Sequence, residues 1–295
     1  MTTKPQMTKR NEETIKITKK ETKKILTKIS DYHGWEHTCL VAHYSKIVAL
    51  GEGKNTFNAE MSSLTHDWGR TIEKTDIKKR SHATLSCIIS KDFYHRLYED
   101  GRINYPQYND IQRAVKRHSC INKTSNDTLK ILRDSDRLSR FDPLGFYHNT
   151  QGILVEEGFP FYIDGQTIIR PADAPVMERK DKKCVIDGLN FCLDFEKIAE
   201  IDSAKKIFKK LRNTYRSFLE LFSRHTDLTD DKLWVAFLKK HADEFRKKKE
   251  NFEKSFIWDE TKKDFEKWLK FYEENVGPEI YSEEKFQDFL NEYQK

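Results

Sequence analysis

The sequence predicts an all-α fold with one short irregular or β-hairpin excursion and a helical extension at the C-terminal end. Apolar residues recur at steps of three and four over most of the 295 residues, which is the period of an amphipathic helix. The exception lies between about 141 and 188, where prolines and glycines interrupt short apolar runs. An apolar fraction of 37% is enough to bury a sizeable core.

The first 30 residues predict a disordered lead over residues 1–8 and then a basic helix or arm. They hold nine Lys or Arg and three Glu, so this segment alone carries a charge equal to the formal +6 of the whole chain. The remainder is near neutral, which weakens an argument for nucleic-acid binding from charge alone. We interpret the segment as a solvated helix end or packing arm in preference to a nucleic-acid-binding arm.

The next amphipathic helix is predicted from about Gly34 to Leu50. His37 recurs with Val41 and Tyr44 at steps of four and three, which places the imidazole on the apolar face. A lone histidine there is more often a satisfied core residue than a metal ligand.

A second helix, about Phe57 to Trp68, carries His66 and Asp67 near its end, with Gly69 as a helix stop. An imidazole beside a carboxylate can contribute two ligands to one cation. The pair gains weight because His37 upstream also falls on the inner face of its helix.

Further helices carry the remaining candidates. Ser81 is a plausible N-cap, and His82 then lies in the first turn, where the helix dipole favours the neutral imidazole. A helix from about Pro106 to His118 ends in a histidine on its apolar stripe.

The helix from about Ser125 to Arg140 places an aspartate among apolar neighbours. A carboxylate buried there is costly unless it is paired or bound to a cation. Asp136 is the candidate, with a structural salt bridge as the competing explanation and Asp134 as the alternative inward residue.

The excursion from 141 to 188 predicts short extended segments around a turn at Asp164-Gly165. These segments are 153–155, 159–163 and 167–169. The excursion is either a lid over the site or a covering loop.

Helical periodicity returns at about 193–223 and continues from Asp231 to the end in Lys-rich segments with regularly spaced aromatic residues. We interpret the aromatic stripe as packing within a C-terminal helical subdomain, in preference to a nucleic-acid or partner surface. The expected domains are therefore an arm over 1–30, a main domain over 31–225 and a C-terminal subdomain over 226–295.

The five cysteines are scattered and form no C-x-x-C pair, which disfavours a disulfide framework and a thiolate zinc site. No apolar run approaches the roughly 20 residues that span a bilayer, and the N-terminus lacks the apolar core of a signal peptide. We therefore expect a cytoplasmic protein without a membrane partner.

The candidate residues follow one another in the order H…HD…H…H…D. The segments that carry this order are Trp35-Glu36-His37-Thr38, Leu64-Thr65-His66-Asp67-Trp68-Gly69-Arg70, His82, His118 and Ile131-Leu132-Arg133-Asp134-Ser135-Asp136-Arg137-Leu138. They resemble the HD superfamily of metal-dependent phosphohydrolases, whose corresponding patterns are L-L-H-D-x-G-[KR] and I-L-x-D-A-D-x-L. The resemblance covers about residues 30–140 and implies an HD-domain helical bundle. The helix at 193–223 is similar, less specifically, to the bacterial stand-alone branch of these hydrolases.

The resemblance implies that His37, His66, Asp67 and Asp136 bind one divalent metal ion. Two imidazoles and two carboxylates suit Mn, Fe, Ni, Co, Zn or Mg and leave positions open for water and a phosphate oxygen.

Asp67 is also a catalytic candidate, together with His82, His118 and Arg70. The two histidines are either ligands of a second metal ion or phosphate contacts and proton shuttles, with a structural role as a further alternative. Arg70 is a phosphate clamp or a surface cation. His33 is expected in a loop or beside the ligands rather than among them.

The first hypothesis is a phosphohydrolase in which a metal-activated water cleaves a phosphomonoester or phosphodiester, with a nucleotide as the expected small phosphorylated substrate. The second is an HD nuclease acting on single-stranded nucleic acid or a cyclic nucleotide, with the basic N- and C-terminal helices as the contact. The third, from a different class, is a non-catalytic regulatory protein that binds a nucleotide.

Overall fold

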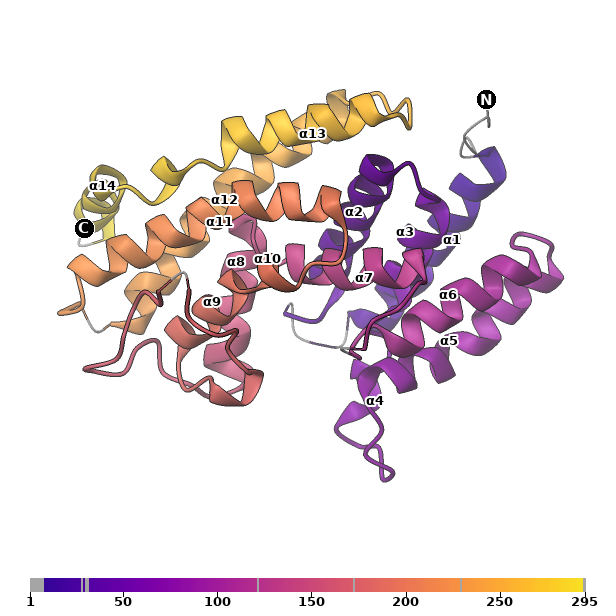
Figure 1. The fold of residues 1–295 in the computed structure, drawn as a ribbon, viewed down its shortest axis with the longest axis horizontal. Helices are drawn as coiled ribbons and strands as arrows, with labels where there is room; N and C mark the ends of the chain where they lie inside the picture. The colour runs from indigo at the N-terminus through magenta and orange to yellow at the C-terminus, as the bar shows by residue number, and fades with distance from the viewer. Residues whose placement is uncertain are drawn as a thin grey trace. The chain divides into compact units, whose positions relative to one another are not determined.

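The computed structural model describes residues 8–27, 29, 32–120, 122–171, 173–228 and 230–293, and these residues form helices, turns and loops but no strand (Figure 1). The predicted all-α fold is therefore confirmed. The disordered lead predicted over residues 1–8 lies, apart from Thr8, outside the described residues. No helix in the described ranges is both long and apolar enough to cross a bilayer.

The chain divides into two compact units. Unit 1 comprises Met1–Ser139, Glu200–Ala204 and Trp258–Glu266. Its helices are α1 (Lys9–Leu26), α2 (Trp35–Glu52), α3 (Thr56–Thr65), α4 (Arg70–Glu73), α5 (His82–Glu99), α6 (Tyr105–Arg117) and α7 (Asp127–Leu138). The division of the sequence at residues 30 and 225 stays a prediction.

Unit 2 comprises Arg140–Ala199, Lys205–Ile257 and Lys267–Lys295. It contains α8 (Pro143–Gln151), the π-helix η1 (Gly152–Glu156), η2 (Arg179–Asp181), α9 (Val185–Leu193), α10 (Phe195–Ile198), most of α11 (Asp202–Arg224), α12 (Asp231–Ser255), most of α13 (Lys262–Asn275), η3 (Pro278–Tyr281) and α14 (Glu283–Tyr293).

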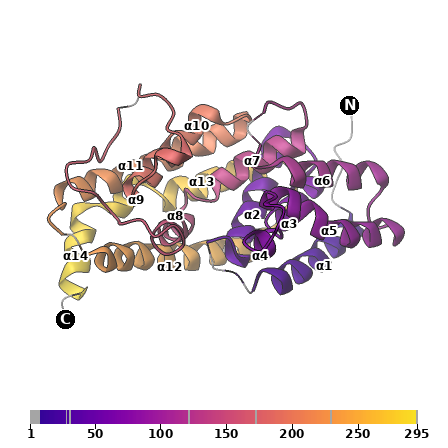
Figure 2. The same ribbon diagram turned by 90° about the horizontal axis from the view of Figure 1, so that it is seen from below.

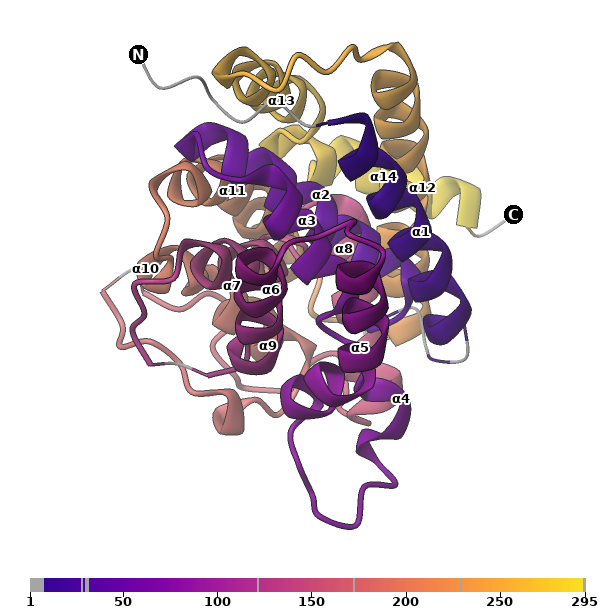
Figure 3. The same ribbon diagram turned by 90° about the vertical axis from the view of Figure 1, so that its right-hand side faces the viewer.

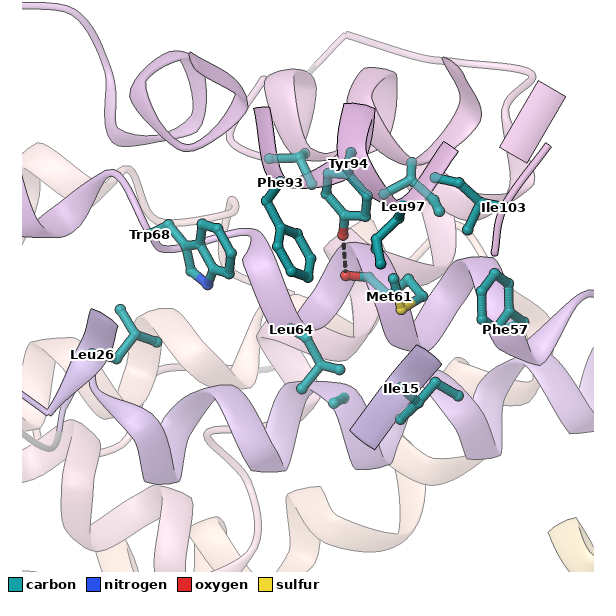
Figure 4. Close-up of a cluster of buried hydrophobic side chains, with 13 residues drawn as sticks. Ile15, Leu26, Phe57, Met61, Leu64, Trp68, Phe93, Tyr94, Leu97 and Ile103 are labelled. Carbon is teal, nitrogen blue, oxygen red and sulfur yellow. Dashed lines mark hydrogen bonds between the residues drawn. The ribbon is translucent and has the colours of Figure 1, made fainter. Parts of the chain in front are cut away.

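A hydrophobic cluster of unit 1 fills the space between α1, α3 and α5 (Figure 4). Trp68, in the turn after α3, packs on Phe93 of α5, and Met61 of α3 lies beside Tyr94. Leu64 of α3 belongs to the same cluster and lies on the side of Ile15 of α1. Burial of each such side chain stabilises the fold by about 1.5–3 kcal/mol. The Tyr94 hydroxyl donates a hydrogen bond to the Met61 carbonyl at 2.8 Å, which fixes α5 against α3.

The basic helix α1 packs against α3 through a buried row of small and apolar residues. Thr22 donates from its hydroxyl to the Leu64 carbonyl at 3.0 Å and accepts from the Trp68 indole N–H at 3.2 Å. Residues 9–26 therefore form a helix whose inner face packs on α3, and the preference for a packing arm over a nucleic-acid-binding arm stays a prediction. Because Trp68 follows Asp67 directly, α1 also steadies the turn that carries the HD dipeptide.

Gly69 permits the close approach of α5 to this turn. A Cβ atom there would lie 2.2 Å from the His82 carbonyl oxygen and 2.6 Å from the Ser86 nitrogen, so any other residue would force α5 away. Its backbone N–H donates to the Ser86 hydroxyl at 2.7 Å. The glycine thus follows the end of α3, as predicted, but its backbone conformation is helical. The fold requires glycine here because it has no side chain to collide with α5.

Two details of the predicted excursion are wrong. The chain is helical from Pro143 to Glu156, so the segment 153–155 is part of the π-helix η1 rather than extended. Asp142 caps this run by accepting from the Gly145 N–H at 2.7 Å, and Pro143 at the first position pre-sets the helical backbone.

The hairpin predicted around Asp164-Gly165 is also absent from the described chain. The turn exists, with Gly165 at φ 76°, but no strands flank it. The carbonyls of Pro160 and Phe161 accept hydrogen bonds from the N–H groups of Val185 and Ile186 at the start of α9. Those carbonyls are therefore unavailable for a strand ladder.

The aromatic stripe of the C-terminal helices is packing, as expected. In unit 2, α12 packs against α8, and the two helices lie next to each other in Figure 2. Trp234 and Phe237 of α12 are buried against Phe218 and Phe286, with the Trp234 and Phe286 rings stacked 4.7 Å apart.

His241 lies buried in this aromatic core, 4.7 Å from the Phe237 ring and 5.5 Å from the Tyr281 ring. Burial, with smaller effects of Lys285, Lys240 and Lys248, lowers its pKa from 6.5 to about 4. The unfolded chain then binds the proton more tightly than the folded chain between these two pH values. Protonation therefore favours unfolding in this window.

We predict that the free energy of unfolding falls as the pH drops from 6.5 to about 4, with about 3 kcal/mol of the loss due to His241. His241→Phe should remove that part of the loss, and His95→Gln, which changes an exposed histidine, should not. Urea unfolding at several pH values measures this, and equal pH slopes for the wild type and His241→Phe would contradict it.

Candidate metal centre

The candidate ligands come from separate helices of unit 1 and meet in its interior. His37 lies in the first turn of α2, His66 ends α3, and Asp67 occupies the turn that follows. His82 begins α5 and His118 ends α6. Asp136 lies near the end of α7. Apart from Asp136 and His82, which are partly exposed, these side chains are buried.

Asp67 lies at the centre of this group, and its two carboxylate oxygens face different neighbours. On the Oδ2 side lie His33 Nδ1 at 3.1 Å, His37 Nε2 at 3.8 Å and His66 Nε2 at 3.6 Å. On the Oδ1 side lie Arg70 Nε at 3.5 Å, His82 Nε2 at 3.7 Å and His118 Nε2 at 3.9 Å. The sequence therefore brings all of its predicted site residues together, and Asp136 Oδ1 joins them 3.4 Å from His37 Nε2.

Backbone carbonyls one turn earlier orient two of the imidazoles. His66 Nδ1 lies 2.6 Å from the Ser63 carbonyl oxygen, and His118 Nδ1 lies 2.8 Å from that of Val115. A carbonyl can only accept, so Nδ1 carries the proton in both rings. Nε2 then presents its lone pair to the centre, which is the tautomer of a metal-binding histidine.

Side-chain oxygens orient the other two rings. His37 Nδ1 lies 3.4 Å from the Ser139 hydroxyl, which itself donates to the Asp136 carbonyl at 2.7 Å and so offers a lone pair to the ring. His82 Nδ1 donates to the Glu73 carboxylate at 3.3 Å. Both rings therefore also turn Nε2 inward.

His82 and His118 place their Nε2 atoms 3.1 Å apart. Because both rings hold their proton on Nδ1, two lone pairs face each other across this distance. Such an arrangement is repulsive unless a proton or a cation lies between or beside the two nitrogens. The close approach of His82 and His118 is therefore consistent with a second metal site or with a proton-transfer site. It disfavours a purely structural role for the two histidines.

The structure distinguishes Asp136 from Asp134. Asp134 is fully buried, accepts from the backbone N–H groups of Glu200 and Ile201, both at 2.8 Å, and pairs with Arg137 at 2.9 Å. It therefore holds residues 200 and 201 to α7 and faces away from the histidines. Asp136 is the aspartate that joins the cluster.

His33 lies beside the expected ligands, and Glu73 and Ser139 join the site without having been among the expected site residues. His33 donates from Nδ1 to Asp67, so it restrains the central carboxylate directly. Its four-residue spacing from His37 was the available signal. Glu73 contacts both Arg70 and His82. The only sign of this in the sequence is its position three residues after Arg70, which is weak evidence.

Arg70 is less exposed than a surface cation, with 18% of its side chain accessible. Its Nε atom faces Asp67, and its Nη1 atom pairs with Glu73 at 2.8 Å. Burial lowers the pKa of Arg70, but the carboxylates of Asp67 and Glu73 raise it by more. The guanidinium therefore stays charged. The remaining donors of the guanidinium can still bind a phosphate.

Burial keeps four of the histidines neutral, and neighbouring groups keep the aspartate charged. Burial lowers the pKa of His33 and His118 to about 3 and also lowers the pKa of His37 and His82. Burial raises the pKa of Asp67, but His66, Arg70 and the hydrogen bond from His33 lower it well below its usual range. Neutral imidazoles around a carboxylate are the protonation states that bind a metal cation.

The donor atoms fit a divalent cation. His66 Nε2 and Asp67 Oδ1 are buried and make no hydrogen bond within the described residues, a state that is costly without a further partner. The ligand atoms of His37, His66 and Asp136 lie within 4.8 Å of one another, as do those of His66, Asp67 and His118 and those of His33, His37 and Asp67. Mixed nitrogen and oxygen donors suit a first-row transition metal.

Comparison with known families and structures agrees with this geometry. The family model described as HD domain matches residues 34–140. HD domains bind divalent metal ions, so the match supports a metal-dependent hydrolase in general. No curated protein matches the chain.

Solved structures share the fold at low sequence identity. Bacillus subtilis YpgQ in complex with ADP is 16% identical, with a TM-score of 0.53, over 75% of this chain and 99% of that one. A Lactobacillus plantarum protein is 15% identical, with a TM-score of 0.53, over 75% and 99%. A Listeria innocua protein is 16% identical, with a TM-score of 0.52, over 74% and 98%.

We predict that substitutions of the two α7 aspartates have opposite effects. Asp134→Ala leaves two backbone donors and Arg137 without their acceptor and should lower the free energy of unfolding by about 3 kcal/mol, with little change in metal binding. Asp136→Asn should weaken metal binding by at least about tenfold and leave stability nearly unchanged.

Urea unfolding without metal and elemental analysis after dialysis against Mn²⁺ separate the two effects. Loss of metal from Asp134→Ala together with full metal content in Asp136→Asn would reverse the assignment.

Proposed function

We propose that this chain, which carries an HD domain over residues 34–140, is a divalent-metal-dependent phosphohydrolase that cleaves a nucleotide phosphomonoester or phosphodiester. The observation that carries the proposal is the buried Asp67 carboxylate, whose two oxygens face inward-pointing Nε2 atoms from different helices. A purely structural salt bridge would use protonated histidines, whereas burial holds His37, His82 and His118 in the neutral form.

His37, His66, Asp67 and Asp136 are the residues that would hold the metal ion. When bound, the ion polarises a phosphate oxygen and makes a water molecule more acidic at neutral pH. Their Nε2 and carboxylate positions are fixed in advance by Ser63, Ser139 and the helix ends. Little reorganisation is then needed on binding, which favours catalysis.

His82, Glu73 and His118 would handle protons and phosphate. His82 Nε2 can take a proton from the attacking water, and the Glu73 carboxylate at Nδ1 then stabilises the imidazolium. His118 Nε2 lies 3.1 Å from His82 Nε2. It would accept a proton, contact the phosphate or bind a further metal ion.

Arg70 would bind phosphate oxygens with the guanidinium donors that Asp67 and Glu73 do not use. Phosphate binding there would neutralise negative charge on the substrate beside the metal ligands.

A nucleotide is the preferred substrate because the related fold of Bacillus subtilis YpgQ was solved with ADP. A cytoplasmic location stays a prediction. A regulatory protein without turnover is the weaker alternative, because the complete ligand set and the hydrogen bonds that orient it would serve no purpose in a degenerate site.

We predict that the protein hydrolyses a generic aryl phosphomonoester or bis-aryl phosphodiester with one or more of Mg, Mn, Ni, Co and Zn. Asp67→Ala should lower kcat by at least about 10³-fold, because it removes the central ligand, and should leave the helical circular dichroism largely intact. Asp127→Asn, which changes a partly exposed aspartate of the same unit, is the matched control. Retained activity in Asp67→Ala would exclude the proposed centre.

We also predict that His82→Ala and His118→Ala lower turnover more than they lower the content of the first metal ion. Elemental analysis and kcat measured on the same preparations give the two values. If either variant loses all metal, that histidine belongs to the first site and the proposed ranking is wrong.

A further inference from the structure

A second candidate site lies between α5 and α6, which run side by side (Figures 1 and 3). It is a groove of about 500 Å³, called here the tyrosine groove. Its lining residues are Lys91, Asp92, His95, Tyr98, Tyr105 and Tyr108. None of them belongs to the candidate metal centre.

The aromatic rings of the tyrosine groove are arranged for stacking and are open to solvent. Tyr98 and Tyr105 are 41% and 59% exposed, although apolar rings of this size are normally buried. Tyr105 and Tyr108 are nearly parallel, at 14° and 6.4 Å, and His95 and Tyr98 are at 23° and 6.4 Å. Tyr108 is partly buried and packs against the hydrophobic cluster of unit 1, whereas Tyr98 and Tyr105 are not part of that cluster.

Lys91 gives the groove a positive wall. It lines the groove and forms no ion pair with any described residue. The opposing charges are Asp92, which also lines the groove, and Glu99, which is paired with His95 at 3.3 Å.

The groove has a direction relative to the metal centre. The helices α5 and α6 are antiparallel: His82 and His118 meet at one end, and the Tyr98 and Tyr105 rings meet at 6.2 Å at the other. Lys91 and Tyr98 lie about 14 Å and 24 Å along α5 from His82, at 1.5 Å per residue. A ligand that reaches from the rings to the metal centre must therefore be a chain rather than a single nucleotide.

We propose that the tyrosine groove binds single-stranded nucleic acid, with bases stacked on Tyr98, Tyr105 and Tyr108 and phosphates beside Lys91. Aromatic platforms beside a positive wall are how proteins bind single strands without reading sequence. A duplex does not fit this mode, because its base faces are stacked on one another. Delivery of the strand to the metal centre rests on the proposed hydrolase function, whereas binding does not.

This assignment differs from the contact expected at the basic N- and C-terminal helices. The aromatic residues of α12 are largely buried, and the inner face of α1 packs against α3. Among the described residues, α1 and α12 therefore present no exposed stacking ring, whereas α5 and α6 do.

Binding is tested by fluorescence anisotropy of a fluorescein-labelled oligothymidylate of about 12 nucleotides, with EDTA present so that no cleavage occurs. Tyr98→Ala and Tyr105→Ala should each weaken binding roughly 5- to 100-fold, and Tyr105→Phe should restore it because the ring is kept. Tyr293→Ala, which removes a tyrosine that is 43% exposed on α14, is the matched control. Equal affinities for Tyr105→Ala and Tyr293→Ala would overturn the proposal, as would no binding by the wild type at low salt.

Salt dependence tests the role of Lys91. Lys91→Ala should reduce the slope of log K against log salt by about 0.7, the value for one phosphate contact on a single strand. An unchanged slope would show that Lys91 does not contact a phosphate and would contradict that part of the proposal. A change of oligomeric mass in Tyr105→Ala with unaltered oligonucleotide binding would identify the groove as a protein interface and overturn the proposal.

Hydrolysis of an aryl phosphoester separates this proposal from the proposed function. Tyr105→Ala should leave that activity unchanged, and Asp67→Asn should abolish it while retaining oligonucleotide affinity. If the wild type has no hydrolase activity but shows the tyrosine-dependent binding, the groove stands and the proposed hydrolase fails.

Discussion

The candidate metal centre of unit 1 is arranged around one buried charge, the carboxylate of Asp67. A carboxylate that is 2% exposed would cost several kcal/mol unless positive charge or hydrogen-bond donors surround it. Helices α2, α3, α5 and α6 each end or begin with a histidine whose Nε2 faces it, and α4 contributes Arg70. The neutral imidazoles of His37, His82 and His118 supply lone pairs rather than charge, an arrangement that could hold a metal cation.

Much of the site was predictable because the HD pattern is local. His66, Asp67 and Gly69 are adjacent in sequence, and helical periodicity places His37 inward. The orientation of the rings was not predictable, because it depends on atoms that only tertiary packing brings near: the Ser139 hydroxyl from the end of α7 and the Glu73 carboxylate. Gly69 correctly predicted the end of α3 as a helix stop. Its further role, which is to leave room for α5, could not be predicted because the approach of α5 depends on tertiary packing.

The limits of sequence reasoning recur elsewhere in the fold. The segment 153–155 has β-branched and apolar residues typical of a strand, but the Asp142 cap and Pro143 start a helix that continues through it. Tyr98 and Tyr105 lie on either side of a turn, so their meeting in one groove follows only from the antiparallel pairing of α5 and α6. The C-terminal aromatics, by contrast, follow a helical period and are buried as expected.

The most direct test of this account is anomalous X-ray diffraction from crystals of the protein grown with Mn²⁺. The account predicts an anomalous peak bounded by His37 Nε2, His66 Nε2 and the carboxylates of Asp67 and Asp136. A second peak beside His82 and His118 would identify these histidines as ligands of a further ion, and a single peak would leave them as proton or phosphate contacts. A fully ordered Asp67 cluster with no peak would contradict the central claim that this buried carboxylate is a metal ligand.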